Sequence, residues 1–369
     1  MIYTELFDSL TMAFNSCNRL KKICIPMSVC VIGERAFRDS TSFTIAGYSN
    51  SIAEKYANDT GCTFESLGVA PVSVIKVKNS YELLGAIRRC VSAEIVLADG
   101  VYAFEEPVTI KNGYNLTIRA ENPGKAEILT FDGYQPVVKF EDCENVTMSG
   151  LILGHYSLVY RGNNCGSGSS SGGYVVYSHR SMNITIDYCD LYGCGTYAAY
   201  LSYTGSMTIK NSVLRDCSQG IAYITGREYS IDEYDVLVEN CIISGNAYKE
   251  EYANNQAAIL NYSNPVEIKN CTFVNNYSTQ FTHNELKAIT ECRFADNAWD
   301  GFEPLEYGVC LNGITWEIVT AFNSLGEIEK VLRIGFDLDC GSFVIDSEVG
   351  AVLPYSTSSL PGRASTMTE

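Results

Sequence analysis

His155, Arg215 and Asp216 are the residues of this 369-residue chain that first suggest acid–base chemistry. His155 is one of three histidines and begins an insertion rich in Gly and Ser that runs to Gly173. A histidine beside such a loop can act as a general acid or base, because its ordinary pKa lies near neutrality. The competing interpretation, a turn residue that bonds the backbone, is the favoured one. Arg215 and Asp216 would contact a substrate beside His155 if the insertion folds over them.

Aromatic residues suggest a second kind of chemistry, the stacking of sugar rings. When the short strands of the chain are aligned on Ile184, the outward position seven residues earlier is occupied in turn by Lys139, Tyr177, Tyr200, Tyr223 (placed across a gap) and Ile259. Such a strip offers flat apolar faces and phenolic hydroxyls that can bond a glycan. Tyr192 is a further candidate for substrate binding. The competing interpretation is that stacked rings stabilise the fold itself, as cross-strand pairs do.

A column of charged residues alternates in sign: Asp187, Lys210, Glu239 and Lys269. Opposite charges on neighbouring strands stabilise a sheet by about 0.2–1 kcal/mol per pair. Two carboxylates beside Lys210 favour its ammonium form, which makes it a poor base. We therefore interpret this column as structural. The sequence places no pair of carboxylates at the separation that a glycosidase requires.

These candidates lie on a repeat that is clearest from Asn183 to Asn297. Each unit is a short strand of alternating apolar and polar residues, followed by a polar turn residue and a small residue at position 189, 212, 241, 271 or 292. The spacings of 23, 29, 30 and 21 residues are typical of solenoid coils. One coil cannot bury its apolar face alone, whereas stacked coils can.

The columns of the repeat predict the architecture. One column is apolar: Ile186, Ile209, Val238 and Ile268. Fixed strands joined by loops of unequal length are typical of a right-handed parallel β-helix, and residues 72–298 resemble the pectate-lyase-like superfamily. The resemblance implies an all-β solenoid. It does not settle the activity, because this fold serves lyases, hydrolases, epimerases and inert spikes.

The chain has 15 cysteines, and several fall in the small inward column of the repeat. Thiols on stacked coils lie about 4.8 Å apart, which is the spacing of strands. That geometry suits a packed column of reduced thiols better than a set of disulfides. No Cys-x-x-Cys pair predicts a zinc site, and we predict no metal-ligating residues.

Residues 67–150 contain the predicted entrance to the solenoid. A strand at 71–77 precedes a helix that Asn79 or Ser80 caps. The apolar face of this helix comprises Leu83, Leu84, Ala86 and Ile87. This order resembles the N-terminal cap of secreted β-helix proteins, in which a helix covers the open end of the coil. Residues 118–125 resemble the chondroitinase B and alginate lyase group, whose enzymes use a Lys and an Arg, often beside calcium; their catalytic motif is not matched here.

Residues 1–66 form a separate predicted unit, in which the segment 13–20 repeats at 36–43 after a shift of 23 residues. The dipeptides Ile25-Pro26, Ile32-Gly33 and Ala36-Phe37 resemble BspA-type leucine-rich repeats of bacterial surface proteins. Such arrays normally need at least three repeats, so we expect this chain to be a piece of a longer protein. Ser51 is expected to cap a helix that packs inward. The alternative is an unrelated α+β cap.

Three domains are therefore predicted: the repeat segment 1–66, the β-helix with its cap at 67–308, and a C-terminal unit at 309–369. The last has expected strands near Trp316, Val331 and Ser342, and a disordered tail from Pro354. The hydrophobic content of 46% and the charged content of 19% predict a well-folded chain. The net charge of −17 argues against nucleic-acid binding. No run is long and apolar enough to span a membrane, and we expect a monomer.

Two functions fit these observations. The first is a carbohydrate-active enzyme, a polysaccharide lyase or glycoside hydrolase that acts along the coil face. The second is a non-catalytic adhesin, or a glycan-binding or structural stalk. Both have a polysaccharide or surface glycan as partner and an extracellular or cell-surface location, although the sequence from Met1 lacks a signal-peptide pattern. No cofactor is predicted, except that calcium could bridge an acidic protein to an anionic polymer.

Overall fold

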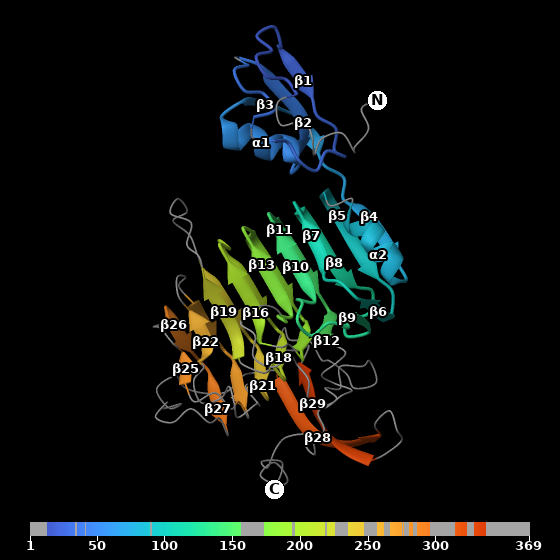
Figure 1. Cartoon of the computed structure of the whole chain (residues 1–369), viewed down its shortest axis with the longest axis vertical. Helices are drawn as coiled ribbons and strands as arrows, with labels where there is room; N and C mark the ends of the chain where they lie inside the picture. Colours follow the sequence, from blue (N-terminus) through green and yellow to red (C-terminus); the bar gives the residue numbers. More distant parts are fainter. Residues whose placement is uncertain are drawn as a thin grey trace.

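The fold is described from a computed structural model (Figure 1). The residues that the structure describes are 13–33, 35–40, 42–88, 91–155, 173–193, 196–217, 220–225, 235–246, 257–261, 266–274, 276, 280–282, 286–295, 314–322 and 328–336. Most of the insertion after His155, together with residues 337–369, lies outside them. The predictions of a third strand near Ser342 and of a disordered tail therefore also fall outside the described residues.

Three parallel sheets wind through the middle of the chain, and successive strands pass from one sheet to the next. The first, sheet I, comprises β4 (Ser73–Val77), β5 (Val91–Leu97), β8 (Tyr114–Ala120), β11 (Glu144–Ser149), β14 (Met182–Asp187), β17 (Met207–Lys210), β20 (Val236–Glu239), β23 (Val266–Lys269) and β26 (Ala288–Thr290). Sheet II comprises β6 (Gly100–Phe104), β9 (Ala126–Thr130), β12 (Leu151–His155), β15 (Asp190–Tyr192), β18 (Val213–Arg215), β21 (Ile242–Ser244), β24 (Thr272–Val274) and β27 (Arg293–Ala295). Sheet III comprises β7 (Val108–Lys111), β10 (Val138–Glu141), β13 (Val176–His179), β16 (Tyr197–Ser202), β19 (Gly220–Thr225), β22 (Ala257–Asn261) and β25 (Gln280–Thr282).

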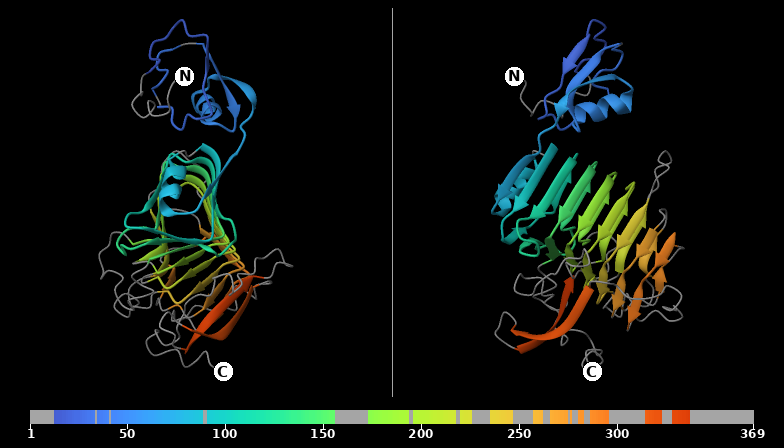
Figure 2. Two further views of the ribbon diagram at one scale, coloured as in Figure 1. Left: turned by 90° about the vertical axis from the view of Figure 1, so that its right-hand side faces the viewer. Right: turned by 180° about the vertical axis from the view of Figure 1, so that it is seen from behind.

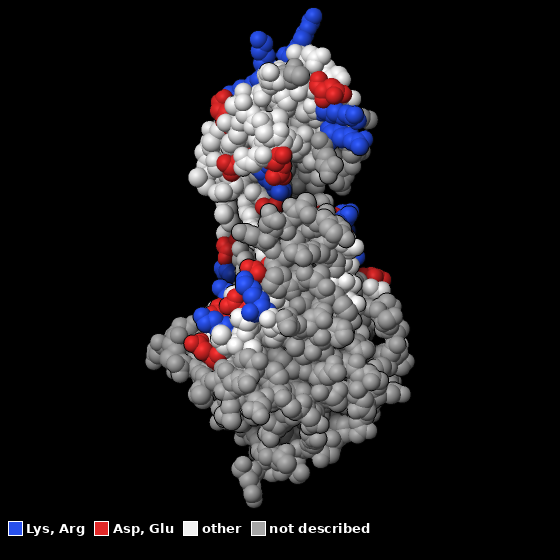
Figure 3. All heavy atoms as spheres, turned by 90° about the vertical axis from the view of Figure 1, so that its left-hand side faces the viewer, with Lys and Arg blue, Asp and Glu red and all other residues white. Residues whose placement is uncertain are grey.

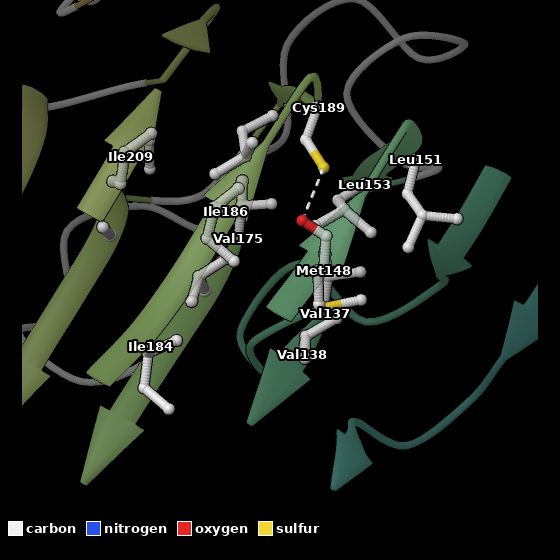
Figure 4. Close-up of a cluster of buried hydrophobic side chains, with 14 of the residues drawn as sticks. Val137, Val138, Met148, Leu151, Leu153, Val175, Ile184, Ile186, Cys189 and Ile209 are labelled. Carbon is white, nitrogen blue, oxygen red and sulfur yellow. Dashed lines mark hydrogen bonds between the residues drawn. The ribbon is translucent and has the colours of Figure 1, made fainter. Parts of the chain in front are cut away.

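The predicted parallel β-helix is confirmed by this arrangement, which Figure 2 shows from two further sides. Ile186 pairs with Ile209, which pairs with Val238, so the predicted apolar column is one column of sheet I. Side chains from all three sheets meet in a single core. Figure 4 shows part of it, with Met148, Ile186 and Leu153 directed into the same space.

The turn after sheet I explains why asparagine recurs in the sequence. Asn211, Asn240 and Asn270 have φ angles of 50°, 54° and 53°, a left-handed conformation that asparagine tolerates better than most residues. Each side-chain amide also donates to the oxygen of the preceding rung, at 3.1 Å from Asn240 to Asn211 and 2.6 Å from Asn270 to Asn240. Asp187 accepts from Asn211 at 2.8 Å. The ladder thereby fixes the register between coils.

Buried thiols follow this turn. Cys143, Cys189, Cys241, Cys271 and Cys292 are each at most 2% exposed, and all are free. Cys189 Sγ lies 3.8 Å from the Met148 carbonyl oxygen of the preceding coil, as Figure 4 shows. Within the described part of the chain, these five buried thiols form no disulfide, in agreement with the expected column of reduced thiols.

Helix α2 (Ser80–Ile87) packs against the first coil. Asn79 Oδ1 accepts from the Glu82 backbone N–H at 2.9 Å, and the Glu82 carboxylate accepts from the Lys78 N–H at 2.9 Å, so the predicted cap is formed by Asn79. Leu83 and Ile87 are buried, whereas Leu84 is 37% exposed. The apolar face of the helix is thus narrower than the sequence predicted.

The N-terminal unit contains β1 (Lys22–Cys24), β2 (Thr44–Ser49), α1 (Ile52–Thr60) and β3 (Thr63–Val69). The two copies of its repeat stack: the Phe14 and Phe37 rings lie 5.1 Å apart at 7°. Ser51 occupies the N-cap position of α1, but its hydroxyl donates to the Tyr48 carbonyl oxygen and makes no cap hydrogen bond. The expected capping role of its side chain was therefore wrong.

The N-terminal unit contacts the first coils of the β-helix. Lys55 Nζ lies 2.5 Å from the Glu144 carboxylate, and the Asn50 carbonyl oxygen accepts from Ser92 and from Asn115. Beside these contacts, a cavity of about 310 Å³ lies between the two units. Lys55 of the N-terminal unit and Arg180 of the β-helix are among the residues that line it. Figure 3 shows basic and acidic side chains on both units where they approach one another.

Near the C-terminus, β28 (Ile314–Phe322) and β29 (Ile328–Phe336) form an antiparallel pair, drawn in red-orange in Figure 1. Two of the three strands expected in this region are therefore present. Of the helices in the described ranges, neither has the length or the apolar run that crossing a bilayer requires.

Candidate functional site

The outer face of sheet III carries the predicted aromatic strip. Lys139 pairs with Tyr177, Tyr177 with Tyr200, and Tyr200 with Tyr223. The ring centroids of Tyr177 and Tyr200 are 5.2 Å apart, and those of Tyr200 and Tyr223 are 4.9 Å apart. All four side chains are half-buried. We call Tyr177, Tyr200 and Tyr223 the tyrosine ladder; it runs along the stack of strands β13, β16 and β19 in Figure 1.

The next rung of the ladder differs from the prediction. Tyr223 pairs with Leu260, whereas Ile259 pairs with Ala222 and is only 2% exposed. Ile259 therefore points into the core, and its assignment to the outward strip was wrong. The cause is the connection from β22 to β23: the outward residue Leu260 stands six residues before Val266, whereas Tyr200 stands seven before Met207. An offset of one residue exchanges the two faces of a strand.

Lys139 closes the ladder at its N-terminal end. Its ammonium lies 5.5 Å from the centre of the Tyr177 ring, and 2.6 Å from a carboxylate oxygen of Glu141. The cation thus contacts both an aromatic face and a carboxylate. A ligand that lies along the ladder would meet charged groups at this end and aromatic groups beyond it.

A second outward column runs beside the ladder, two residues further along each strand. Its members are Lys111, Glu141, His179, Ser202 and Thr225. His179 Nδ1 lies 3.3 Å from Ser202 Oγ, and the imidazole lies parallel to the Tyr177 ring at 6.2 Å. Sequence reasoning missed this column, although the alternation that places Tyr177 outward also places His179 outward.

Three other candidates, Arg215, Asp216 and Tyr192, are close together on sheet II. Arg215 donates to both oxygens of Asp190, at 3.0 and 2.8 Å, and to Asp216 at 2.8 Å. Its guanidinium lies 4.5 Å from the centre of the Tyr192 ring. Glu127 accepts from the Tyr192 hydroxyl. We call these five residues the arginine cluster.

The arginine cluster is buried rather than open. Arg215, Asp190 and Tyr192 are 1%, 3% and 4% exposed. The Tyr192 ring lies flat against Gly154, where a Cβ would come within 2.1 Å of the Tyr192 Cζ, so only glycine fits there. The cluster therefore offers little accessible surface to a ligand in this state of the protein.

Burial and charge together set the protonation of the arginine cluster. Burial raises the pKa of Asp216 to about 6, although the Arg215 charge opposes this. Burial lowers the pKa of Arg215, but the charges of Asp190 and Asp216 more than offset it, so that this pKa lies above its ordinary value. Burial also raises the pKa of Tyr192, and the charge on Glu127 adds to the effect. Arg215 and Tyr192 consequently keep their protons at neutral pH.

His155 lies on the other side of the same sheet. Strand alternation directs Leu153 and His155 inward, whereas Arg215 points outward. His155 is fully buried, and its Nε2 lies 2.8 Å from the Gln135 carbonyl oxygen. Burial lowers its pKa, which keeps the ring neutral. The structure thus does not bring His155 together with Arg215 and Asp216 on one face; its Nε2 contacts a backbone carbonyl oxygen instead.

Across the described ranges, no group of three or more His, Cys, Asp or Glu side chains could hold a metal ion. The charged column of sheet I is present as predicted: Lys210 lies 3.6 Å from Asp187, and Lys269 lies 3.6 Å from Glu239. These side chains pair with one another on neighbouring strands.

Comparison with known proteins agrees with this architecture. A family model described as a right-handed β-helix region matches residues 174–323. The strands of this region as far as β27 belong to sheets I, II and III, whereas β28 pairs with β29 outside them. The β-helix is similar in structure to a pectin methylesterase from Yersinia enterocolitica, with a TM-score of 0.39, 12% identity, and coverage of 67% of this chain and 82% of that one. A pectin methylesterase from Erwinia chrysanthemi gives a TM-score of 0.36, 13% identity and coverage of 67% and 77%. No curated protein is detectably similar to the β-helix chain in sequence. At these TM-scores and identities, the two likenesses carry no argument about the activity or the site of this chain.

Proposed function

We propose that this β-helix binds a polysaccharide along the outer face of sheet III, with the tyrosine ladder as the principal contact. The observation that carries the proposal is the register of three half-buried tyrosines on consecutive strands, with ring centroids about one strand spacing apart. A polymer is the ligand that such a row fits, because one extended chain can meet several rings in succession.

The physical basis is the dual character of tyrosine. The ring presents a flat apolar face to the C–H groups of a sugar, and the hydroxyl bonds to sugar oxygens. The rings contact one another, which limits their rotation before any ligand arrives and so reduces the entropy lost on binding. Lys139 adds a cation at one end of the row.

Binding is better supported by the geometry than cleavage by a lyase or glycoside hydrolase. In the part of the chain that the structure describes, the acidic candidate Asp216 lies on sheet II and is paired with Arg215. The ladder lies on sheet III. The proposal therefore includes an adhesin or glycan-binding stalk at a cell surface, and the resemblance of residues 1–66 to BspA-type repeats supports an interaction role.

A panel of soluble polysaccharides, with and without calcium, tests the proposal by affinity electrophoresis. Truncation of Tyr200 to alanine should weaken binding by about threefold to tenfold, and the double Tyr177→Ala, Tyr200→Ala variant should weaken it further. Tyr81→Ala is the matched control, because Tyr81 is 88% exposed on α2, away from the ladder. Unchanged affinity in the double variant would exclude the ladder as the binding face. Mass spectrometry of the same mixtures detects any cleavage products.

A further inference from the structure

Three chemically complementary side chains follow one another on the outer face of sheet III. Glu141 pairs in register with His179, and His179 pairs with Ser202. They come from β10, β13 and β16, so each stands on a different coil. A hydroxyl, an imidazole and a carboxylate in this order are the components with which proteins activate a serine for attack on an acyl group.

The contact between the first two groups is already present. His179 Nδ1 lies 3.3 Å from Ser202 Oγ, slightly beyond a short hydrogen bond and within the range of such pairs before a substrate binds. If Nδ1 accepts the Ser202 proton, the neutral ring carries its own proton on Nε2. That tautomer leaves an N–H free to donate, and Glu141 is the acidic neighbour in register with the ring.

Glu141 has the charge that this role requires. The pKa of Glu141 lies below its ordinary value, first because the Lys139 ammonium donates to it, and also because of the charge on Lys111. The carboxylate is therefore ionised at neutral pH. An ionised carboxylate on the neighbouring coil would stabilise the imidazolium that forms when His179 takes a proton.

Aromatic rings border the imidazole on two sides. The Tyr177 ring lies parallel to it at 6.2 Å, and the Tyr203 ring meets it edge-on at 5.9 Å and 89°. Tyr203 is 47% exposed, His179 is half-buried and Ser202 is 6% exposed. The serine is thus recessed below rings to which a sugar could bind, and the imidazole reaches the surface beside it.

We propose that Ser202, His179 and Glu141 form an acyl-transfer site that hydrolyses ester bonds, with O-acylated carbohydrate as the substrate class. The choice of carbohydrate rests on the proposed function, because the tyrosine ladder borders the site. The choice of an ester rests on the serine and histidine alone.

The reaction balances without any further reactant except water. Ser202 Oγ bonds to the ester carbonyl carbon while His179 accepts the hydroxyl proton. The bond from that carbon to the sugar oxygen then breaks, and His179 returns the proton to the departing sugar hydroxyl. Water, deprotonated by His179, attacks the acyl-serine, so that a carboxylic acid leaves and Ser202 regains its proton.

Tyr200 is placed to assist this reaction. It lies two residues before Ser202 on the same face of β16. Burial is the main reason that the pKa of Tyr200 is raised, so the phenol stays protonated. A protonated phenol can donate to the oxygen on which negative charge develops when the serine attacks.

The test uses the full chain with two small probes that need no glycan, p-nitrophenyl acetate and a fluorophosphonate. We expect hydrolysis of the ester and attachment of one phosphonate to the peptide that contains Ser202, located by mass spectrometry. Ser202→Ala should abolish the labelling and lower turnover about 100-fold or more, and His179→Gln should lower both. Ser149→Ala is the matched control, since Ser149 is an outward serine of sheet I and should behave as the wild type.

Two results of this experiment would refute the acyl-transfer site. Wild-type chain that neither hydrolyses the ester nor reacts with the phosphonate overturns the acyl-transfer site, and so does labelling at another residue that persists in Ser202→Ala. The labelling experiment uses the unaltered chain, so it holds even where a variant fails to fold.

The glycan panel distinguishes this inference from the proposed function. Polysaccharide binding without ester hydrolysis or labelling would remove the acyl-transfer site and leave the glycan-binding face. Ester hydrolysis at Ser202 without binding to any polysaccharide would remove the glycan proposal and the carbohydrate substrate, and leave an esterase for another class of ester. Release of acetate from an acetylated polysaccharide, lost in Ser202→Ala, would support both together.

Discussion

The outer faces of sheets II and III differ in what covers them. On sheet III the tyrosine ladder is half-buried and faces outward. On sheet II, Arg215, Asp190 and Tyr192 of the arginine cluster are almost fully buried, with Arg215 at 1% exposure. Both faces are made by the same alternation, in which every second residue of a short strand points away from the core.

The comparison teaches that pointing away from the core is not the same as facing solvent. A charged side chain on a covered outer face must pair with opposite charges inside the protein, as Arg215 does with Asp190 and Asp216. A side chain on an open outer face is free to meet a ligand. The first face should therefore contribute mainly to stability, and the second mainly to recognition.

The sharpest way to test this division is to remove the Arg215 charge. Arg215→Met leaves Asp190 and Asp216 without their cation in a buried place, and should lower the free energy of unfolding by roughly 3–5 kcal/mol. Urea unfolding measures the change, and Lys210→Met on the open face of sheet I is the matched control. A loss below about 1 kcal/mol would mean that the cluster is not held in a dry interior.

The stability that the arginine cluster contributes is expected to depend on pH, because Asp216 titrates with an altered pKa. The pKa of Asp216 is about 6 in the folded chain against an ordinary value of 3.8, so the folded state holds this proton more tightly than the unfolded state does. The resulting stabilisation is complete below about pH 4 and is lost as the pH rises through about 6. It amounts to at most about 3 kcal/mol.

Unfolding of wild type and of Asp216→Asn, compared from pH 4 to pH 7, measures this contribution. The wild type should lose stability relative to the variant as the pH rises. A difference that stays constant over this interval would show that Asp216 titrates as an ordinary surface carboxylate.

The tyrosine ladder should contribute less to stability than to binding. Tyr200→Ala removes contacts with three neighbouring rings, those of Tyr174, Tyr177 and Tyr223, and should cost about 1 kcal/mol in unfolding free energy, because its ring is half-exposed. Thermal melting and the glycan panel, performed on the same sample, compare the two effects. A loss of several kcal/mol would instead identify the ladder as a structural element.

The smallest effect is expected on sheet I. Lys210→Ala removes a partly exposed ion pair with Asp187 at 3.6 Å, and should change the unfolding free energy by about 0.2–1 kcal/mol. The change should shrink at high salt, because the pair lies near solvent. Urea unfolding at low and high salt measures the change in unfolding free energy and its dependence on salt. A change as large as that caused by Arg215→Met would contradict the proposed difference between open and covered faces.

The sequence predicted the β-helix well because its period reports stacking directly. The column of Ile186, Ile209 and Val238 follows from coil spacing, and the strip of Tyr177, Tyr200 and Tyr223 follows from alternation. Both depend only on local pattern, provided that the coils are aligned correctly.

Two features could not be predicted from the local sequence pattern. Ile259 was misplaced because the connection that follows β22 is one residue shorter than in the coil of Tyr200, so a count of seven residues back from Val266 reaches the inward face. The burial of Arg215 was not foreseen because alternation tells which side of a strand a residue is on, but not what covers that side. His155 and Arg215 were grouped for the same reason, although they lie on opposite sides of sheet II.

The buried thiols can serve as chemical probes of local opening along the β-helix. Burial raises the pKa of Cys143 to about 11 and that of Cys189 to about 12, so almost no thiolate, the form that reacts with alkylating agents, exists at neutral pH. Modification must therefore await local opening of the coil that carries each thiol. Since Cys143, Cys189, Cys241 and Cys271 stand on different coils, their separate alkylation rates would show where along its axis the β-helix begins to unravel.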